Sequence, residues 1–232
     1  MLLKDKVVVV SGIGPGLGQE LSTLAAREGA AAVVLAARTP AKLDQAEQEI
    51  LDLGLGTAVL KVPTDIADKE QCQALADRTV ESFGRIDVLF NSAYDPGSFE
   101  PIEQADMDGW RRAMDVNFFG TMHLTQACVA HMKDSGGGSI VMIATMVEHK
   151  PLATQGGYGA SKSALRSATK HLALELGPYN IRVNSCHMGW MWGPSVEGYF
   201  AWQAQATGKS QEELVSEVTR NIPLGVIPDD GE

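Results

Sequence analysis

The fold of this chain is decided by residues 7–18, which read Val7-Val8-Val9-Val10-Ser11-Gly12-Ile13-Gly14-Pro15-Gly16-Leu17-Gly18. Four consecutive β-branched residues predict a strand that is buried on both faces of a sheet. The glycines that follow allow a tight turn and a close approach of the backbone to a ligand. A helix predicted at 17–28 would then offer free amides and its dipole to a pyrophosphate. The stretch therefore predicts the first strand and the phosphate loop of a dinucleotide-binding fold.

The alternation of strand and helix continues outward from this loop. Further strands are predicted at 33–36, 57–62, 86–90, 139–144 and 181–186, and helices at 41–53, 68–83, 107–132 and 158–176. Strict alternation with short loops indicates a parallel sheet with crossover helices on both faces. We expect one α/β domain over residues 1–232, a Rossmann-type doubly wound parallel sheet in a three-layer α/β/α arrangement.

Composition restricts the classes of function. The chain has 232 residues and a net charge of −10, so it lacks the broad basic surface of a nucleic-acid-binding protein. Cys72, Cys128 and Cys186 are far apart, which argues against a disulfide scaffold or a zinc site and for a reducing compartment. We expect Cys186 to act as a small apolar residue in a buried strand. The apolar runs are too short for a signal peptide or a membrane span, so we expect a cytoplasmic protein.

A tyrosine and a lysine lie four residues apart in the helix predicted at 158–176. Tyr158 and Lys162 would share one helix face. A free tyrosine has a pKa of about 10, and a nearby ammonium lowers it towards the working range. The pair predicts a proton donor and acceptor for carbonyl or alcohol chemistry. By itself the spacing also fits a surface lysine beside a half-buried tyrosine.

The end of the second strand bears on the choice of cofactor. Dinucleotide-binding folds place either an acid for the ribose hydroxyl or an arginine for a 2′-phosphate about 20 residues after the glycine loop. The sequence there is Ala36-Ala37-Arg38-Thr39, which has no carboxylate. The guanidinium of Arg38 suits a planar phosphate contact, so NADP is favoured over NAD. A solvated arginine after a strand is the alternative.

Taken in order, these motifs resemble the short-chain dehydrogenase/reductase family in its single-domain form, from Lys6 to about Gly193. The resemblance implies a pyrophosphate loop, an adenine contact, a ribose segment and a glycine against the nicotinamide. These cofactor-binding positions are Gly12, Gly16, Leu17 and Gly18, then Asp65 and Ile66, then Asn91 and Ala93, and finally Gly189.

The same resemblance implies the catalytic residues Tyr158, Lys162, Thr145 and Asn117. Thr145 stands at the position of the family's catalytic serine, and Asn117 at that of an asparagine that holds a proton-relay water. The implied reaction is hydride transfer between NADP(H), or NAD(H), and a carbonyl or secondary alcohol, without a metal. The resemblance also implies a homodimer or homotetramer formed through the helices that carry Asn117 and Tyr158.

Several positions depart from the family pattern. Thr145 keeps a hydroxyl but adds a methyl group that narrows the pocket. Tyr94 stands in place of a small glycine, and Pro15 in place of a residue that is often basic in NADP-using members. Met188 replaces a proline and Gly193 a threonine. A cofactor-binding scaffold or sensor with weak catalysis is therefore the alternative, and an NAD-dependent alcohol dehydrogenase is the alternative among enzymes.

The segment at about 188–220 concentrates the aromatic residues Trp190, Trp192, Tyr199, Phe200 and Trp202. We expect it to be a lid over a bulky apolar or cyclic substrate, with a satellite core or a subunit contact as the alternative. A charged helix is predicted at 212–219. The family adds a last helix and strand, which we expect to be absent from this sequence.

One glutamate and two histidines could suggest a metal-binding or catalytic role. Glu148 and His149 are adjacent in a predicted loop, and we expect no metal site there because further ligands are missing. His187 ends a predicted strand near the site, and we expect its role to be structural.

Overall fold

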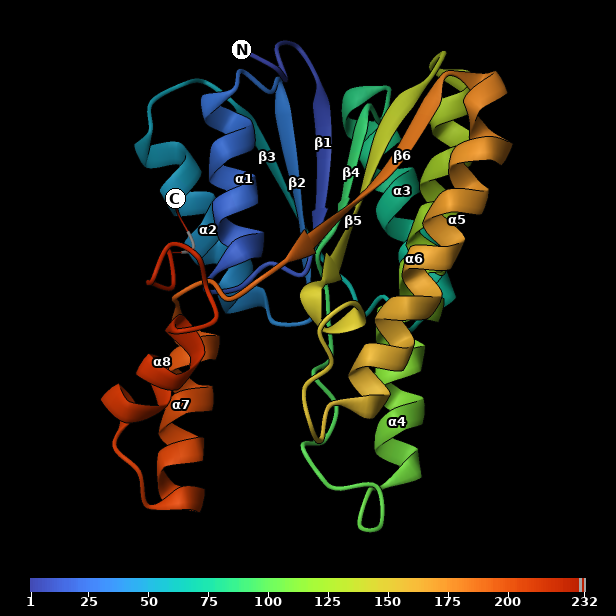
Figure 1. The fold of residues 1–232 in the computed structure, drawn as a ribbon. Helices are drawn as coiled ribbons and strands as arrows, with labels where there is room; N and C mark the ends of the chain where they lie inside the picture. Colours follow the sequence, from blue (N-terminus) through green and yellow to red (C-terminus); the bar gives the residue numbers. More distant parts are fainter. Residues whose placement is uncertain (230, 232) are drawn as a thin grey trace.

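A six-stranded parallel sheet forms the centre of the computed structural model, which describes residues 1–229 and 231 (Figure 1). Its strands are β1 (Val7–Ser11), β2 (Ala32–Ala37), β3 (Ala58–Pro63), β4 (Val88–Asn91), β5 (Gly138–Thr145) and β6 (Ile181–Met188). They lie in the order β3-β2-β1-β4-β5-β6. The predicted Rossmann-type sheet is confirmed, because the order reverses at β1, where a doubly wound fold binds its ligand.

Helices cover the sheet on both faces. One face packs against α1 (Leu17–Arg27) and α2 (Pro40–Asp52), and the other against α3 (Lys69–Phe83), α5 (Thr121–Asp134) and α6 (Gly156–Leu176). The residues of β1 alternate between these two cores, since Val8 and Val10 face α1 and α2 while Val7 and Val9 face α3 and α5. All four are at most 4% exposed, as a strand buried on both faces requires.

The helix predicted at 107–132 is divided. It begins as α4 (Met107–Met114), passes through a π-helical turn (η1, Asp115–Gly120) and continues as α5 to Asp134. The turn lies against the β3–α3 loop, where a Cβ at Gly120 would stand 2.9 Å from the carbonyl oxygen of Ile66. Single π-helical turns inside α-helices occur often at functional sites.

The segment at 188–220 forms two helices, α7 (Pro194–Thr207) and α8 (Gln211–Thr219). They project beyond the carboxyl ends of the strands, at the bottom left of Figure 1. The charged stretch at 212–219 is helical as predicted, whereas α7 was not predicted. Its end signals are in the sequence, since Pro194 stands at the first turn and Gly208 has a left-handed φ of 73°.

Strand β6 lies at the edge of the described sheet, and the expectation that Cys186 is buried is wrong. Arg182, Asn184 and Cys186 point to the same side of β6 and are all exposed. Ile181 and Val183 point to the opposite side, towards the core that contains α6, and are buried. Among the described residues, no helix has the length and apolar character that crossing a membrane requires.

Candidate active site

The carboxyl ends of the strands open into a cleft of about 700 Å³. Parallel register places the ends of β1, β2 and β4 side by side, with Ser11 opposite both Ala36 and Asn91. Predicted site residues that line the cleft are Gly12, Gly16, Leu17, Gly18, Arg38, Asp65, Ile66, Ala93, Thr145, Tyr158, Lys162 and Gly189. The structure therefore brings together residues from the carboxyl ends of the strands and from the segments that follow them.

The glycine loop forms a cradle that only glycine can build. Gly12 has a φ of 81°, and a Cβ on it would clash with the backbone of Ser92 and Ala93. A Cβ on Gly18 would clash with the carbonyl of Gly12. Gly16, with a φ of 103°, begins α1 without a side-chain cap from the described residues. The uncapped amides at this helix start fit a pyrophosphate group.

A basic pair lies at the end of the cleft beyond β2. Arg38 lines the cleft, as predicted from its position after the strand. Lys42 also lines it, and a Cβ on Gly14 would stand 3.4 Å from its Nζ, so the ammonium lies beside the glycine loop. Lys42 was missed in the sequence, although its place in the first turn of α2 could have indicated it. Together the two cations supply local positive potential in a protein of net charge −10.

Asn91 departs from its predicted place. Its side chain is 2% exposed, and its amide donates to Thr125 Oγ1 at 3.0 Å and to Met142 Sδ at 3.2 Å. The side chain therefore joins β4 to α5 and β5 inside the core and does not line the cleft. The residues that follow it, Ser92, Ala93 and Tyr94, line the cleft instead.

Asn117 is also buried behind the cleft wall, in the π-helical turn. Its Nδ2 donates to the carbonyl of Asp95 at 2.8 Å and to Ser161 Oγ at 2.9 Å, and its Oδ1 accepts from the amide of Asp95 at 2.7 Å. Both N–H groups of the amide are thus used to join the β4–α4 loop to α6. Its predicted contact with a relay water stays a prediction.

Near the start of α6, Tyr158 is half-buried and Lys162 is buried. Two adjacent glycines make room for this start, because a Cβ on Gly156 or Gly157 would stand 2.8 Å from the ring of Trp110. Lys162 is 2% exposed, and its Nζ donates to the carbonyl of Ile143 at 2.8 Å. Its ammonium lies 6.0 Å from the centre of the Tyr158 ring.

Burial changes the acidity of both groups. It raises the pKa of Tyr158 to about 12, a change that contact with the Thr145 hydroxyl partly opposes. It lowers the pKa of Lys162 to about 8, against the attraction of Glu148. The pKa of Tyr158 is therefore raised, whereas the spacing of the pair led us to expect a lowered one. Loss of hydration is the largest influence on it.

Thr145 begins a short helical turn, η2 (Met146–Glu148), through a capping box. Its Oγ1 accepts from the amide of Val147 at 3.3 Å, and Glu148 Oε1 accepts from the amide of Thr145 at 3.3 Å. The hydroxyl of Thr145 is thereby held on the cleft wall beside Tyr158. The sequence contains this signal, since a threonine followed three residues later by a glutamate is a capping-box pattern.

The structure adds His187 to the adjacent pair Glu148 and His149. Their potential ligand atoms all lie within 4.8 Å of one another, so the third residue that the sequence seemed to lack is present. His187 Nδ1 lies 3.6 Å from Glu148 Oε1, and the two imidazole rings are 5.1 Å apart. The Glu148 carboxylate also pairs with Arg166, whose Nε lies 3.1 Å from Oε2.

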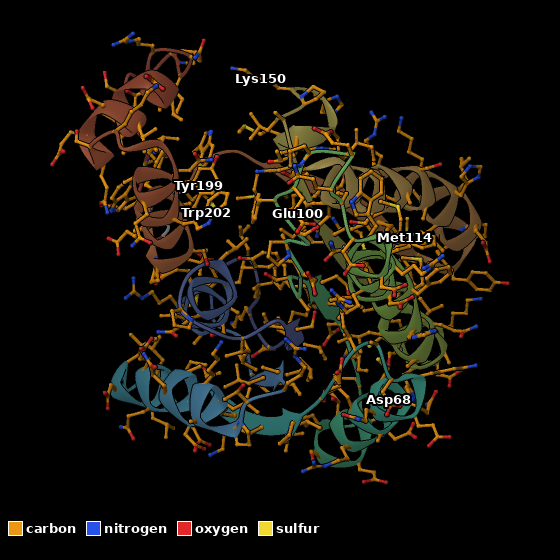
Figure 2. The ribbon with its side chains drawn as sticks, turned by 90° about the horizontal axis from the view of Figure 1, so that it is seen from below. Asp68, Glu100, Met114, Lys150, Tyr199 and Trp202 are labelled. Carbon is orange, nitrogen blue, oxygen red and sulfur yellow. The ribbon has the colours of Figure 1, made fainter. Side chains whose placement is uncertain are left out.

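Aromatic residues of α7 face the β4–α4 loop. Figure 2 shows Tyr199 and Trp202 directed from α7 towards the β4–α4 loop. Phe99 of that loop lies 5.8 Å from the Tyr199 ring and 5.7 Å from the Trp202 ring. Trp190 stacks on Phe200 with the ring centres 5.6 Å apart. The segment therefore contacts the β4–α4 loop, as a lid would.

A polar contact closes the same entrance. Tyr94, which lines the cleft, donates to Ser195 Oγ at 3.3 Å. A second, smaller cavity of about 300 Å³ lies between η2, α7 and α8. Met146, Leu152 and Trp190 line both cavities, so the two spaces adjoin.

Comparison with known proteins agrees with this geometry. The family model described as short chain dehydrogenase matches residues 6–204. The chain belongs to this family, and it is therefore an oxidoreductase with a nucleotide-binding fold for a nicotinamide cofactor.

A curated relative is trans-4-hydroxycyclohexanecarboxylate dehydrogenase of Sinomonas cyclohexanicum, 35% identical over 202 residues, which are 84% of this chain and 75% of the relative. The NAD⁺-bound xylitol dehydrogenase structure has a TM-score of 0.93 at 28% identity, covering 100% of this chain and 90% of that one. L-Sorbose reductase from Gluconobacter frateurii, complexed with NADPH and L-sorbose, has a TM-score of 0.91 at 28% identity, covering 100% and 88%.

Proposed function

We propose that this protein interconverts a bulky cyclic ketone and its secondary alcohol, with NADP(H) as the preferred cofactor. One observation carries the proposal: Thr145, Tyr158 and Lys162 line the same cleft as the glycine cradle. A proton donor and a phosphate-binding loop thus face one space. When bound, the nicotinamide supplies the hydride, which is the step that the side chains themselves cannot perform.

The protein's own groups then handle the proton and the orientation of the substrate. Tyr158, with a pKa raised to about 12 by burial, is protonated at neutral pH and suits donation to a carbonyl oxygen. The hydroxyl of Thr145 offers a second hydrogen bond to the same oxygen. The ammonium of Lys162, fixed on the Ile143 carbonyl, stabilises negative charge that develops on the phenol oxygen as its proton leaves.

The cofactor preference rests on the basic pair beyond β2. Arg38 and Lys42 are the residues that would hold a 2′-phosphate of the adenosine ribose, and Asp65 after β3 is the one carboxylate among the described residues that line the cleft. Solved relatives contain either NAD⁺ or NADPH, so the preference depends on these side chains of the present chain. A guanidinium with a neighbouring ammonium favours NADP(H), the cofactor that carries the additional phosphate.

The substrate class rests on the lid. The cavity between η2, α7 and α8 is lined mainly by apolar and aromatic side chains, and it adjoins the space beside Tyr158. A ring larger than a simple ketone can bury its apolar face there. The curated relative from Sinomonas is named for a cyclohexane substrate, which supports a cyclic ketone or alcohol as the substrate class.

Replacing Tyr158 with Phe tests the function directly. We expect turnover of cyclic ketones to fall by at least ~10³-fold, because the proton donor is lost while the cleft keeps its shape. NADPH affinity, measured by calorimetry, should stay within about twofold of the wild type because phosphate binding lies elsewhere. Turnover retained in this variant, or a wild type that binds NADPH but reduces no ketone of a broad panel, would refute the proposal.

A further inference from the structure

Glu148 has a place in the site that the proposed reaction does not yet explain. Its side chain is fully buried, and a buried carboxylate costs several kcal/mol unless it is paired. The groups that face it come from three separate elements. They are the Thr145 amide and His149 on the η2 segment, Arg166 on α6, and His187 on β6.

Each of these elements carries part of the candidate site. Tyr158, Lys162 and Arg166 follow one another at four-residue steps, so they lie along one side of α6. The Arg166 guanidinium is 3.1 Å from Glu148 Oε2 as an ion pair, without a hydrogen bond aligned on that oxygen from the described residues. The carboxylate thereby fixes the helix that carries the proton donor.

The contacts of Glu148 with the Thr145 amide and with His187 hold two other parts of the cleft lining in place. The Thr145 amide donates to Oε1, which anchors the start of η2 and with it the Thr145 hydroxyl. His187 precedes Met188 and Gly189 on the strand end that lines the cleft. Ser185 Oγ lies 3.1 Å from His187 Nε2 and leaves Nδ1 directed to the carboxylate.

We propose that Glu148 is a positioning residue for the reaction: its buried carboxylate holds Thr145, the Tyr158 helix and the strand end before Gly189 in one arrangement. The inference rests on the proposed function, since it concerns the same proton transfer. It assigns no contact between Glu148 and the substrate.

The negative charge of Glu148 also shifts the pKa of the two groups that handle the proton. It raises the pKa of both Tyr158 and Lys162, because a nearby anion disfavours the phenolate and favours the ammonium. Removing this charge therefore lowers the pKa of Tyr158. The Arg166 guanidinium, then unpaired, acts in the same direction. A purely structural carboxylate elsewhere in the fold would not have this effect.

Glu148→Gln keeps the shape and removes the charge, and Glu148→Asp keeps the charge. The matched control is Asp87→Asn, because Asp87 is also a buried carboxylate, paired with Arg85 and Lys6 and accepting from the amide of Val7. Asp87 lies just before β4, at the amino ends of the strands, whereas the cleft lies at their carboxyl ends. The measurements are kcat and KM against pH for alcohol oxidation, with melting temperature and NADP⁺ affinity.

We expect Glu148→Gln to lower kcat about tenfold and to move the alkaline rise of the rate to lower pH by about half a unit. Glu148→Asp should keep the wild-type pH profile, and Asp87→Asn should lower only the melting temperature. If Glu148→Gln merely destabilises the protein as Asp87→Asn does, with an unchanged pH profile, the inference is overturned.

A readout that needs no turnover separates this inference from the proposed function. The phenolate absorbance of Tyr158, obtained by subtracting the Tyr158→Phe titration, should be larger in Glu148→Gln than in the wild type near about pH 10.5. Equal phenolate fractions would overturn the role of Glu148. An inactive wild type with the expected difference in phenolate would refute the proposed function and leave the electrostatic role of Glu148 standing.

Discussion

At the scale of single residues, burial decides the chemistry of the candidate site. Spacing in the sequence correctly placed Tyr158 and Lys162 on one helix, and the glycine loop was equally visible because its residues are contiguous. Spacing could not show how much hydration the two side chains lose, so the raised pKa of Tyr158 was not predicted. A pKa depends on hydration and on neighbours from other elements, which a local pattern does not contain.

We expect the buried ammonium of Lys162 to lower the free energy of unfolding, although the proposed reaction requires it. Burial lowers its pKa to about 8, so the folded state bears the full cost of the charged form below that pH. As the pH rises from about 8 towards 10.5, the folded protein loses this proton before the unfolded chain does, and its relative stability increases. We expect Lys162→Met to raise the free energy of unfolding by ~1–2 kcal/mol at pH 7 and to abolish turnover.

Urea unfolding at several pH values provides the measurement. The stability difference between Lys162→Met and the wild type should shrink as the pH rises above about 8. A variant that is less stable than the wild type at pH 7, or a difference independent of pH, would contradict the expectation.

The basic pair Arg38 and Lys42 should govern the cofactor preference. We expect Arg38→Ala and Lys42→Ala each to weaken NADPH binding about tenfold or more, since each removes a charged partner of the 2′-phosphate. NADH binding should change little. Calorimetric titration of both cofactors gives the result, with Lys133→Ala as a control because Lys133 lies over the Tyr179 ring, away from the cleft. Equal losses for the two cofactors would show that the pair does not select the phosphate.

At the scale of elements, the bounds of the strands and of the helices that cover the sheet were predicted within a few residues. Hydrophobic periodicity marks them locally. Helix α7 was missed because its aromatic residues do not follow a helical repeat, although Pro194 and Gly208 mark its ends. The contact of Phe99 with α7 joins segments about 100 residues apart in the chain, and no local pattern could have indicated it.

Phe99 should hold the lid over the substrate. Truncating it to alanine removes ring contacts with Tyr199 and Trp202, and such aromatic pairs contribute about 0.5–1.5 kcal/mol each. We expect Phe99→Ala to raise KM for a bulky cyclic ketone about tenfold while kcat changes less than about twofold. Steady-state kinetics with acetone as a small ketone should show little change.

Tyr179→Ala is the control for that experiment, because Tyr179 is a half-exposed aromatic residue distant from the cleft lining. A similar rise in KM for large and small ketones would assign Phe99 a general structural role.

At the scale of the whole molecule, the chain carries a net charge of −10. One domain was predicted from the sequence pattern, whereas an oligomer was implied only by the resemblance to the family. The structure adds candidate contact residues. Phe119 on η1 is 48% exposed and Leu174 on α6 is 80% exposed, both on the helices that the resemblance points to. Covering exposed apolar side chains of this size with a second copy of the chain would stabilise an oligomer.

We therefore expect sedimentation equilibrium to give a mass of two or four times 24.8 kDa. Leu174→Glu should shift the population towards the monomer, because a carboxylate would be buried without a partner. Leu51→Glu is the matched control, since Leu51 is 53% exposed on α2, on the other face of the sheet. A monomeric wild type, or equal effects of the two variants, would contradict the predicted interface.

The aromatic segment at 188–220 also gives the protein a built-in optical probe. Of the four tryptophans, Trp190, Trp192 and Trp202 belong to this segment, and Trp110 packs on the glycines at the start of the Tyr158 helix. All of the indole fluorescence therefore originates around the cleft. Its emission spectrum and its energy transfer to a reduced nicotinamide should follow cofactor binding and lid closure without any attached label.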